Sequence, residues 1–207
     1  MNHPLLDDLN DAQAAVVSAP NGHCLVLAGA GSGKTRVLVH RVAWLLDEEH
    51  VRPSQILAVT FTNKAAAEMK ERLEGLRPGV HGYWVGTFHG LAHRLLRLHP
   101  LEAGLPETFQ VLDADDQTKL IRQIVKDMQL DDELFVPRQI TNWISSQKDE
   151  GRTPRDVKVS NSIEQTLAEV FQVYQERCNL GGLVDFAELL LRAHALLKNT
   201  PVPVSYT

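Results

Sequence analysis

The eight residues Ala28–Thr35, which read AGAGSGKT, constrain this chain more than any other feature of its sequence. They follow a short apolar run, Cys24–Leu27, and precede a segment, Arg36–Leu46, whose apolar residues fall on one helical face. A glycine-rich loop that ends in Gly-Lys-Thr and joins a strand to a helix is the pattern of a phosphate-binding P-loop. The pattern therefore predicts an α/β fold that binds a nucleotide, and a plain glycine-rich turn is the alternative interpretation.

The residue types of this loop suit phosphate chemistry. Its glycines let the backbone curl so that successive N–H groups point at phosphate oxygens, and the N-terminus of the following helix adds partial positive charge. We expect Lys34 to contact the β- and γ-phosphates of ATP and the Thr35 hydroxyl to ligate Mg²⁺. The other expected nucleotide contacts in the loop are Ala28, Gly29, Ala30, Gly31, Ser32 and Gly33. Ala28 replaces the usual first glycine, which is tolerable if its φ is negative.

The first half of the chain alternates apolar runs with segments of helical periodicity. The expected strands are Cys24–Leu27, Ile56–Thr60 and Tyr83–Gly86, and the expected helices are Arg36–Leu46, Asn63–Leu73 and Phe88–Leu98. Continuously apolar strands that alternate with helices form a parallel sheet covered on both faces. This half is therefore predicted to be an α/β unit built around the P-loop.

The second half has helical patterns almost throughout. The expected helices begin at an Asp113 N-cap, at Pro137, at a Ser162–Gln165 capping box and at an Asp185–Glu188 pair of the same spacing. Phe109–Leu112 is the one expected strand, and Gly151–Asn161 has the composition of a linker. An all-helical region therefore follows the α/β region.

Charge divides along the same line. The whole chain has a formal charge of −5, but residues 1–100 carry +1 and residues 101–207 carry −6. The first half is therefore the better candidate to face an anion, although charge alone favours the alternative that both halves are simply solvated surfaces. No apolar run is long enough to cross a membrane and no signal peptide is evident, so we expect a cytoplasmic protein without a membrane partner.

Cys24 and Cys178 both lie in apolar patterns and are expected to be buried free thiols.

Two polar segments follow the second and third expected strands, Thr60–Ala66 and Gly86–Gly90. Ligands of open α/β sheets bind at the carboxyl ends of the strands, so both segments lie at the expected functional edge. Their hydroxyls and helix N-termini suit phosphates, and Phe61 suits stacking on a base of single-stranded nucleic acid. The alternative is helix capping by Thr62 or Asn63 and by Thr87, with Phe61 in the core.

These segments together resemble the UvrD/Rep/PcrA family of superfamily 1 DNA helicases. Leu9–Gln13 resembles the Q motif of that family, and Ala28–Thr35, Thr60–Ala66 and Gly86–Gly90 resemble its motifs I, Ia and Ib. Ser146–Gly151 and Gly182–Phe186 resemble stretches further along. The resemblance covers nearly the whole chain with its motifs in the right order.

The resemblance implies an ATP-driven motor that moves 3′ to 5′ along single-stranded DNA, acts at single-strand/double-strand junctions in repair and replication, and has DNA-repair proteins as partners. It implies that Gln13 recognises adenine and that Arg36 lies near the base. It further implies DNA contacts at Phe61, Thr62, Asn63, Thr87 and His89. Gln13 has an alternative role, because Asn10 and Gln13 also have the spacing of a capping box.

The resemblance also implies the domain organisation. Residues 1–92 correspond to the N-terminal part of a RecA-like subdomain 1A, and residues 93–207 to an inserted helical subdomain 1B. ATP hydrolysis needs an acidic pair at a strand end, whereas Asp113 and Asp185 both have cap spacing at helix starts. We therefore expect a truncated chain that binds nucleotide without hydrolysis or unwinding.

Other functions remain as alternatives. One is a non-catalytic module that binds DNA or protein and carries a vestigial P-loop. A P-loop kinase of small substrates is disfavoured, because no acceptor site is evident. His89 and His93 have helical spacing for a metal, but no third ligand accompanies them.

Overall fold

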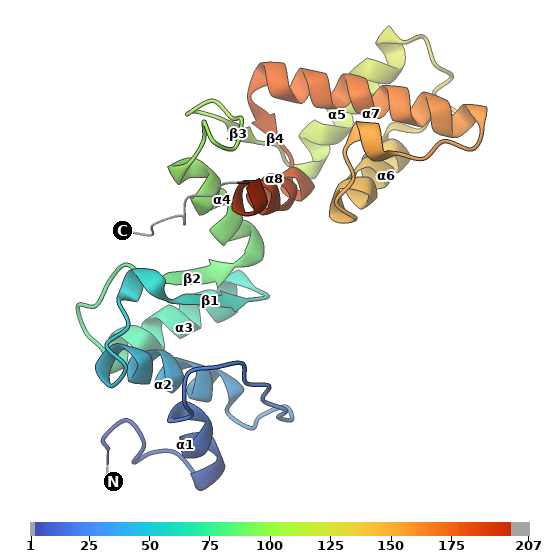
Figure 1. Ribbon diagram of the computed structural model, residues 1–207. Coiled ribbons are helices and arrows are strands. Elements are labelled where there is room, and N and C mark those ends of the chain that lie inside the picture. Colours follow the sequence, from blue (N-terminus) through green and yellow to red (C-terminus); the bar gives the residue numbers. More distant parts are fainter. Residues whose placement is uncertain (1–2, 200–207) are drawn as a thin grey trace. The chain divides into compact units, whose positions relative to one another are not determined.

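The computed structural model describes residues 3–199 and divides into two compact units (Figure 1). Unit 1 ends at Leu91 and unit 2 begins at Ala92, so the boundary falls inside helix α4, Phe88–Leu98. The sequence predicts this helix with the same bounds, because its apolar residues recur at helical spacing. Each unit is described by itself below.

Unit 1 is built on a pair of parallel strands. Its elements are α1 (Asp11–Val17), α2 (Lys34–Asp47), a 3₁₀ turn η1 (Pro53–Gln55), β1 (Leu57–Thr60), α3 (Asn63–Leu76) and β2 (Trp84–Thr87), followed by the start of α4. Strands β1 and β2 pair in register from Leu57 opposite Trp84 to Thr60 opposite Thr87. Helix α3 contacts both strands, α2 packs on α3, and α1 packs on α2 (Figure 1).

The core of unit 1 lies between the strands and these helices. Met69 and Leu73 of α3 meet Val39 and Val42 of α2 and Val85 of β2, and all five side chains are buried. The sequence predicts a sheet that is covered on both faces, but within the described residues helices cover one face at this position and leave the other exposed. Ala58 is buried, whereas Leu57, which precedes it and so points to the opposite face, is exposed. Within the described residues, the sheet is thus open at Leu57.

The first predicted strand, Cys24–Leu27, is absent. The segment is a loop beside α1 and α2 (Figure 1), and Leu25 and Leu27 are 84% and 86% exposed. A strand requires backbone hydrogen bonds to a neighbour, and this segment forms none within the described part of the chain. The apolar run correctly indicated strand composition, but composition supplies no neighbouring strand.

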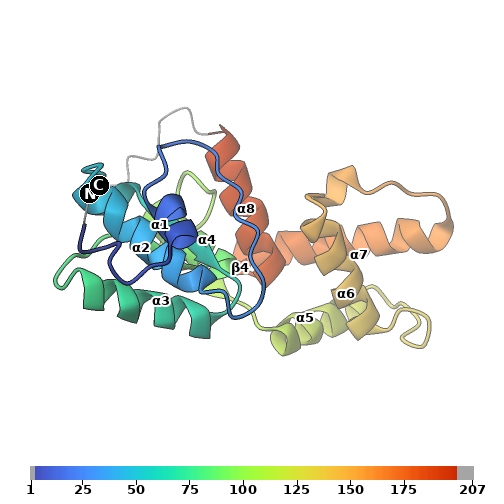
Figure 2. The same ribbon diagram turned by 90° about the horizontal axis from the view of Figure 1, so that it is seen from below.

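Unit 2 is helical apart from one small parallel pair. Its further elements are β3 (Gln110–Val111), α5 (Ala114–Asp127), α6 (Pro137–Asp149), a 3₁₀ turn η2 (Pro154–Asp156), α7 (Ser162–Gly181), β4 (Leu183–Val184) and α8 (Phe186–Asn199). Helix α5 packs against both α6 and α7 (Figure 2). Ile124, Ile144 and Phe171 lie fully buried in the core that these helices form.

The ends of these elements test the predicted caps. Asp113 caps α5 as predicted, because its Oδ1 accepts a hydrogen bond from Asp116 N at 2.8 Å. Helix α7 is capped by Asn161, which accepts from Glu164 N at 2.9 Å, so the predicted Ser162 box is wrong by one residue. Strand β4, which pairs in parallel with β3, was not expected. At two residues it is too short to give a periodic pattern.

The two cysteines differ in their surroundings. Cys178 is buried as expected, and burial raises the pKa of its thiol to about 11, which disfavours the reactive thiolate. Cys24 is exposed, contrary to expectation, because the strand that would have buried it is absent. Across residues 3–199, no helix has the length and apolar character needed to cross a membrane.

Candidate functional site

The glycine-rich loop leads directly into helix α2. Gly33 is the N-cap of α2, with φ of 83° and ψ of 21°, and Lys34 is the first helical residue. Gly31 also has a positive φ, of 74°, whereas Gly29 does not. Left-handed backbone favours glycine, so the sequence pattern is explained at positions 31 and 33. The N-terminal N–H groups of a helix therefore lie next to the loop, where an anion is favoured.

The Lys34 side chain folds back over the loop. Its Nζ donates hydrogen bonds to the carbonyl oxygens of Ala28, at 3.1 Å, and Gly29, at 2.6 Å. The Ser32 hydroxyl donates to the same Gly29 oxygen at 2.8 Å. These bonds hold an exposed ammonium group beside the loop. The acceptors are neutral carbonyls, which bind an ammonium group less strongly than charged oxygens do.

A cavity of about 600 Å³ adjoins the loop. Its walls come from α1, the segment before the loop, the loop itself and α2, and they include Gln13, Ala28, Ser32, Lys34 and Arg41. The volume is in the range of small-molecule and cofactor sites. Loop, lysine and cavity thus form one site within unit 1.

Gln13 links α1 to this loop. Its Oε1 accepts from Asn10 N at 3.2 Å and its N–H donates to Asn10 Oδ1 at 2.9 Å, so the predicted capping box is confirmed. Its Nε2 also donates to Ser32 O at 3.0 Å. The Gln13 amide is thereby engaged at both of its polar atoms.

Arg36 and Arg41 both belong to α2, and of these two residues Arg41 lines the cavity. Arg36 lies 3.8 Å from Asp8, in an exposed ion pair. Arg41 was missed by sequence reasoning. Its guanidinium donates to the carbonyl oxygens of Val17, at 2.8 Å, and Ala19, at 2.6 Å, and so attaches the end of α1 to α2. Its place seven residues after Lys34, on the same helical face, was the available signal.

The predicted DNA-contacting residues follow the two paired strands. Because β1 and β2 are parallel and in register, the residues after them lie at one edge. Thr87 Oγ1 donates to Asn63 Oδ1 at 3.4 Å, which brings the two segments together. Thr62 caps α3 through Ala65 N at 3.1 Å, and Thr87 accepts from Gly90 N at 3.2 Å, so the capping roles are confirmed.

Phe61 distinguishes the two interpretations of this edge. Its side chain is 95% exposed, which excludes the alternative in which it packs in the core. An exposed aromatic ring between capped helix starts is a suitable stacking surface for a base. His89, on the first turn of α4, is exposed as well.

The second histidine of α4 is used internally in unit 2. Arg97 Nε donates to His93 Nε2 at 3.2 Å, and Arg97 also lies 4.0 Å from the centre of the Phe109 ring. Burial, aided by Arg97, lowers the pKa of His93. No cluster of three metal-binding side chains occurs in the part of the chain that the structure describes.

Gly33 provides a direct test of the loop geometry. A Cβ at this position would lie 2.8 Å from Gln13 Nε2, and φ is 83°. We expect Gly33→Ala to lower the free energy of unfolding by about 1–2 kcal/mol from backbone strain alone. Gly29→Ala is the matched control, because Gly29 has an ordinary φ and open space around it. Urea denaturation measures both, and an equal effect of the two variants would contradict the described loop.

The loop before α2 and the parallel strand pairs define a helix-rich chain with small parallel sheets. A family model described as the UvrD/REP helicase N-terminal domain matches residues 9–206. The chain belongs to this family.

The relatives found for this chain are also DNA helicases, in agreement with the family match. The chain is 58% identical over 199 residues to DNA helicase II of Escherichia coli K12, covering 95% of the chain and 28% of that protein. It is 49% identical over 204 residues to DNA helicase II of Haemophilus influenzae, covering 96% and 28%. It is 42% identical over 204 residues to the ATP-dependent DNA helicase PcrA of Bacillus subtilis, covering 97% and 28%. The chain thus spans little more than a quarter of the length of these relatives.

Proposed function

We propose that this chain is the N-terminal part of an ATP-dependent 3′–5′ DNA helicase that acts in DNA repair and replication, and that it binds ATP and single-stranded DNA. The observation that carries the proposal is the loop at the start of α2, with Lys34 beside it, in a member of a helicase family. Two of the relatives are named DNA helicase II and ATP-dependent DNA helicase PcrA, and these names support the proposal of an ATP-dependent DNA helicase.

To bind at this site, ATP would have to compete with loop carbonyl oxygens for the hydrogen bonds of Lys34 and Gln13. Charged phosphate oxygens are stronger acceptors for Lys34 than the carbonyls of Ala28 and Gly29, so the ammonium group is expected to turn towards them. Thr35 would hold Mg²⁺, which neutralises phosphate charge when bound, and its hydroxyl forms no hydrogen bond within the described residues. Adenine recognition by Gln13 would require release of its bond to Ser32 O or of its cap.

The two structural units support the proposed domains. We assign residues 1–92 to a RecA-like subdomain 1A and residues 93–207 to a helical subdomain 1B, and the unit boundary after Leu91 lies one residue away. Because the relatives are DNA helicases, we also propose junction DNA and DNA-repair proteins as partners of this chain. The cytoplasm is the proposed location.

Hydrolysis is proposed to be negligible for the 207-residue polypeptide. The two acids that follow short strands, Asp113 and Asp185, both cap helices in the structure. Asp185 is also buried in an ion pair with Lys148, at 2.6 Å. Both carboxylates are thus engaged in capping within unit 2, and we propose that the described residues supply the phosphate-binding loop without the acidic pair that positions water.

Single-stranded DNA binding should depend on Phe61. Phe61→Ala is expected to weaken binding of an oligothymidylate by about 5- to 150-fold, since stacking on one base contributes about 1–3 kcal/mol. Fold stability should not change, because the ring is exposed. Fluorescence anisotropy of a labelled oligonucleotide measures the affinity. Phe186→Ala, an exposed phenylalanine of unit 2, serves as the control, and equal affinities of both variants would contradict the proposed DNA edge.

A further inference from the structure

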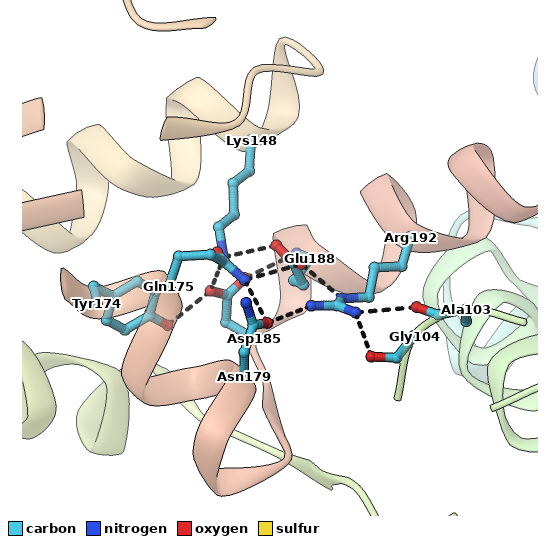
Figure 3. Close-up of polar contacts among 9 residues, drawn as sticks. All are labelled: Ala103, Gly104, Lys148, Tyr174, Gln175, Asn179, Asp185, Glu188 and Arg192. Carbon is cyan, nitrogen blue, oxygen red and sulfur yellow. Dashed lines mark hydrogen bonds and ion pairs between the residues drawn. The ribbon is translucent and has the colours of Figure 1, made fainter. Parts of the chain in front are cut away.

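Unit 2 contains a network of charged and polar side chains, buried at one end and exposed at the other, that the proposed function does not use (Figure 3). It joins α6, α7, the start of α8 and the backbone after α4. Its members are Lys148, Tyr174, Gln175, Asn179, Asp185, Glu188 and Arg192, with the carbonyl groups of Ala103 and Gly104. The network is within one unit, and its members come from segments far apart in the sequence.

Lys148 occupies the inner end of this network. Its side chain is 1% exposed, and its Nζ lies 2.6 Å from Asp185 Oδ2 and 2.9 Å from Glu188 Oε2. Tyr174 OH donates to the same Asp185 oxygen at 2.7 Å, and Asp185 Oδ1 accepts from Glu188 N at 2.8 Å. The lysine of α6 is thereby attached to the first turn of α8.

Arg192 occupies the outer end and connects α8 to the segment after α4. Its Nε donates to Glu188 Oε1 at 2.7 Å, and its two other nitrogens reach three further acceptors. These are Ala103 O at 3.0 Å, Gly104 O at 3.1 Å and Asn179 Oδ1 at 2.6 Å. Gly104 has a φ of 67°, and a Cβ there would approach Arg192 at 3.6 Å. The backbone of this segment is thus arranged to meet the guanidinium group.

The same two segments also pair through their backbones. Gln110 N donates to Gly182 O at 2.8 Å, and Leu112 N donates to Val184 O at 2.9 Å. Residues 99–112, the stretch after α4 that we call the entry segment, are therefore bound both to the strand that precedes α8 and to α8 itself. One bond set is the short β3–β4 pair, and the other is the guanidinium group of Arg192.

Stability alone is a weak explanation for this arrangement. Two cations, Lys148 and Arg192, balance two carboxylates, Asp185 and Glu188; three of these residues are buried, and the side chain of Arg192 is 16% exposed. Desolvation offsets much of the attraction in such a network, and apolar residues of similar volume often stabilise a fold as well. Charged hydrogen bonds, however, are directional, and they hold their partners in one arrangement.

We propose that Arg192 and its buried partners clamp the entry segment, residues 99–112, to helix α8, so that both open and close as one cooperative unit. A displacement of the entry segment is then passed to α8 instead of being absorbed between them. Arg192 is a positioning residue in this account. The proposal concerns unit 2 alone and does not depend on nucleotide or DNA binding.

Native-state hydrogen exchange of the 207-residue chain tests the clamp. Arg192→Leu should lower the protection of the Leu105 and Gln110 amides by about tenfold or more relative to that of Leu196, a buried residue of α8, because the entry segment then opens separately from the helix. The ratio of protection factors is the readout, since a general loss of stability lowers all three amides together.

Two further variants make the result decisive. Arg177→Leu removes an arginine of α7 that pairs with Asp127 at 2.7 Å, outside the network, and should leave the ratio unchanged. Arg192→Lys keeps the charge beside Glu188 but cannot reach all four acceptors, and it should shift the ratio in the same direction. If Arg192→Leu does not fold, Arg192→Lys decides. A parallel fall of the three amides, or no change, in the Arg192 variants would overturn the proposal.

Discussion

Lys148→Met should lower the free energy of unfolding by about 3–5 kcal/mol, because it leaves the buried carboxylates of Asp185 and Glu188 without their shared cation. Asp185 would keep Tyr174 and Glu188 would keep Arg192 as hydrogen-bond donors, so the chain is expected to fold. Urea denaturation followed by circular dichroism measures the loss. Lys119→Met is the control, because Lys119 pairs with Asp116 on the exposed face of α5. A loss as small as that of the control would contradict the role of the network.

The contribution of Lys148 should also have a characteristic pH dependence. Burial by itself would lower the pKa of Lys148, but attraction to Glu188 and Asp185 outweighs it, and the pKa lies above its usual value. A group with a raised pKa in the folded state contributes fully below its unfolded pKa, about 10.4 for lysine, and the contribution is lost as the pH rises through the folded pKa. The difference between wild type and Lys148→Met should therefore be constant through neutral pH and shrink only in strong alkali.

Lys34→Ala should weaken ATP binding by roughly 10- to 150-fold, because a hydrogen bond to a charged group contributes about 1.5–3 kcal/mol. The fold should be unaffected, since Lys34 is exposed and alanine is a good residue for the first turn of α2. Titration with a fluorescent ATP analogue measures binding. Lys70→Ala, an exposed lysine of α3, is the control.

The same titration separates the proposed function from its alternative. If the wild-type chain does not bind ATP at all, the loop is vestigial and a DNA- or protein-binding module is the better description. ATP turnover is the second readout, and the wild-type polypeptide should show none above background. DNA-stimulated turnover that disappears in Lys34→Ala would contradict the proposal that hydrolysis is negligible.

Local features of this fold could be predicted from the sequence. The bounds of α4, the Asp113 cap and the Asn10–Gln13 capping box follow from spacing along the chain, because each depends on residues within one helical turn. Residue type permits the positive φ of Gly31 and Gly33 but does not fix it, because Gly29 of the same loop has an ordinary φ. In the candidate site, these local rules placed the loop before a helix, although the helix begins at Lys34, two residues before the predicted start at Arg36.

Features that depend on distant partners could not be predicted. Cys24–Leu27 has strand composition, but a strand forms only where another strand supplies hydrogen bonds, and the apolar run contains no information on that neighbour. Asp185 was expected to cap a helix and does, yet its ion pair with Lys148 joins residues 37 positions apart. The spacing of Arg41 from Lys34 indicated a shared helical face, but its partners, which are the backbone carbonyls of Val17 and Ala19, could not be predicted from that spacing.

The central claim is that the loop at the start of α2 binds the phosphates of a nucleotide. The most direct test is calorimetric titration of the 207-residue chain with ATP, ADP and AMP in the presence of Mg²⁺. The account predicts that affinity falls from ATP to ADP and again to AMP, because each lost phosphate removes charge-assisted bonds to Lys34 and to the helix N-terminus. Equal affinity for the three nucleotides would contradict it.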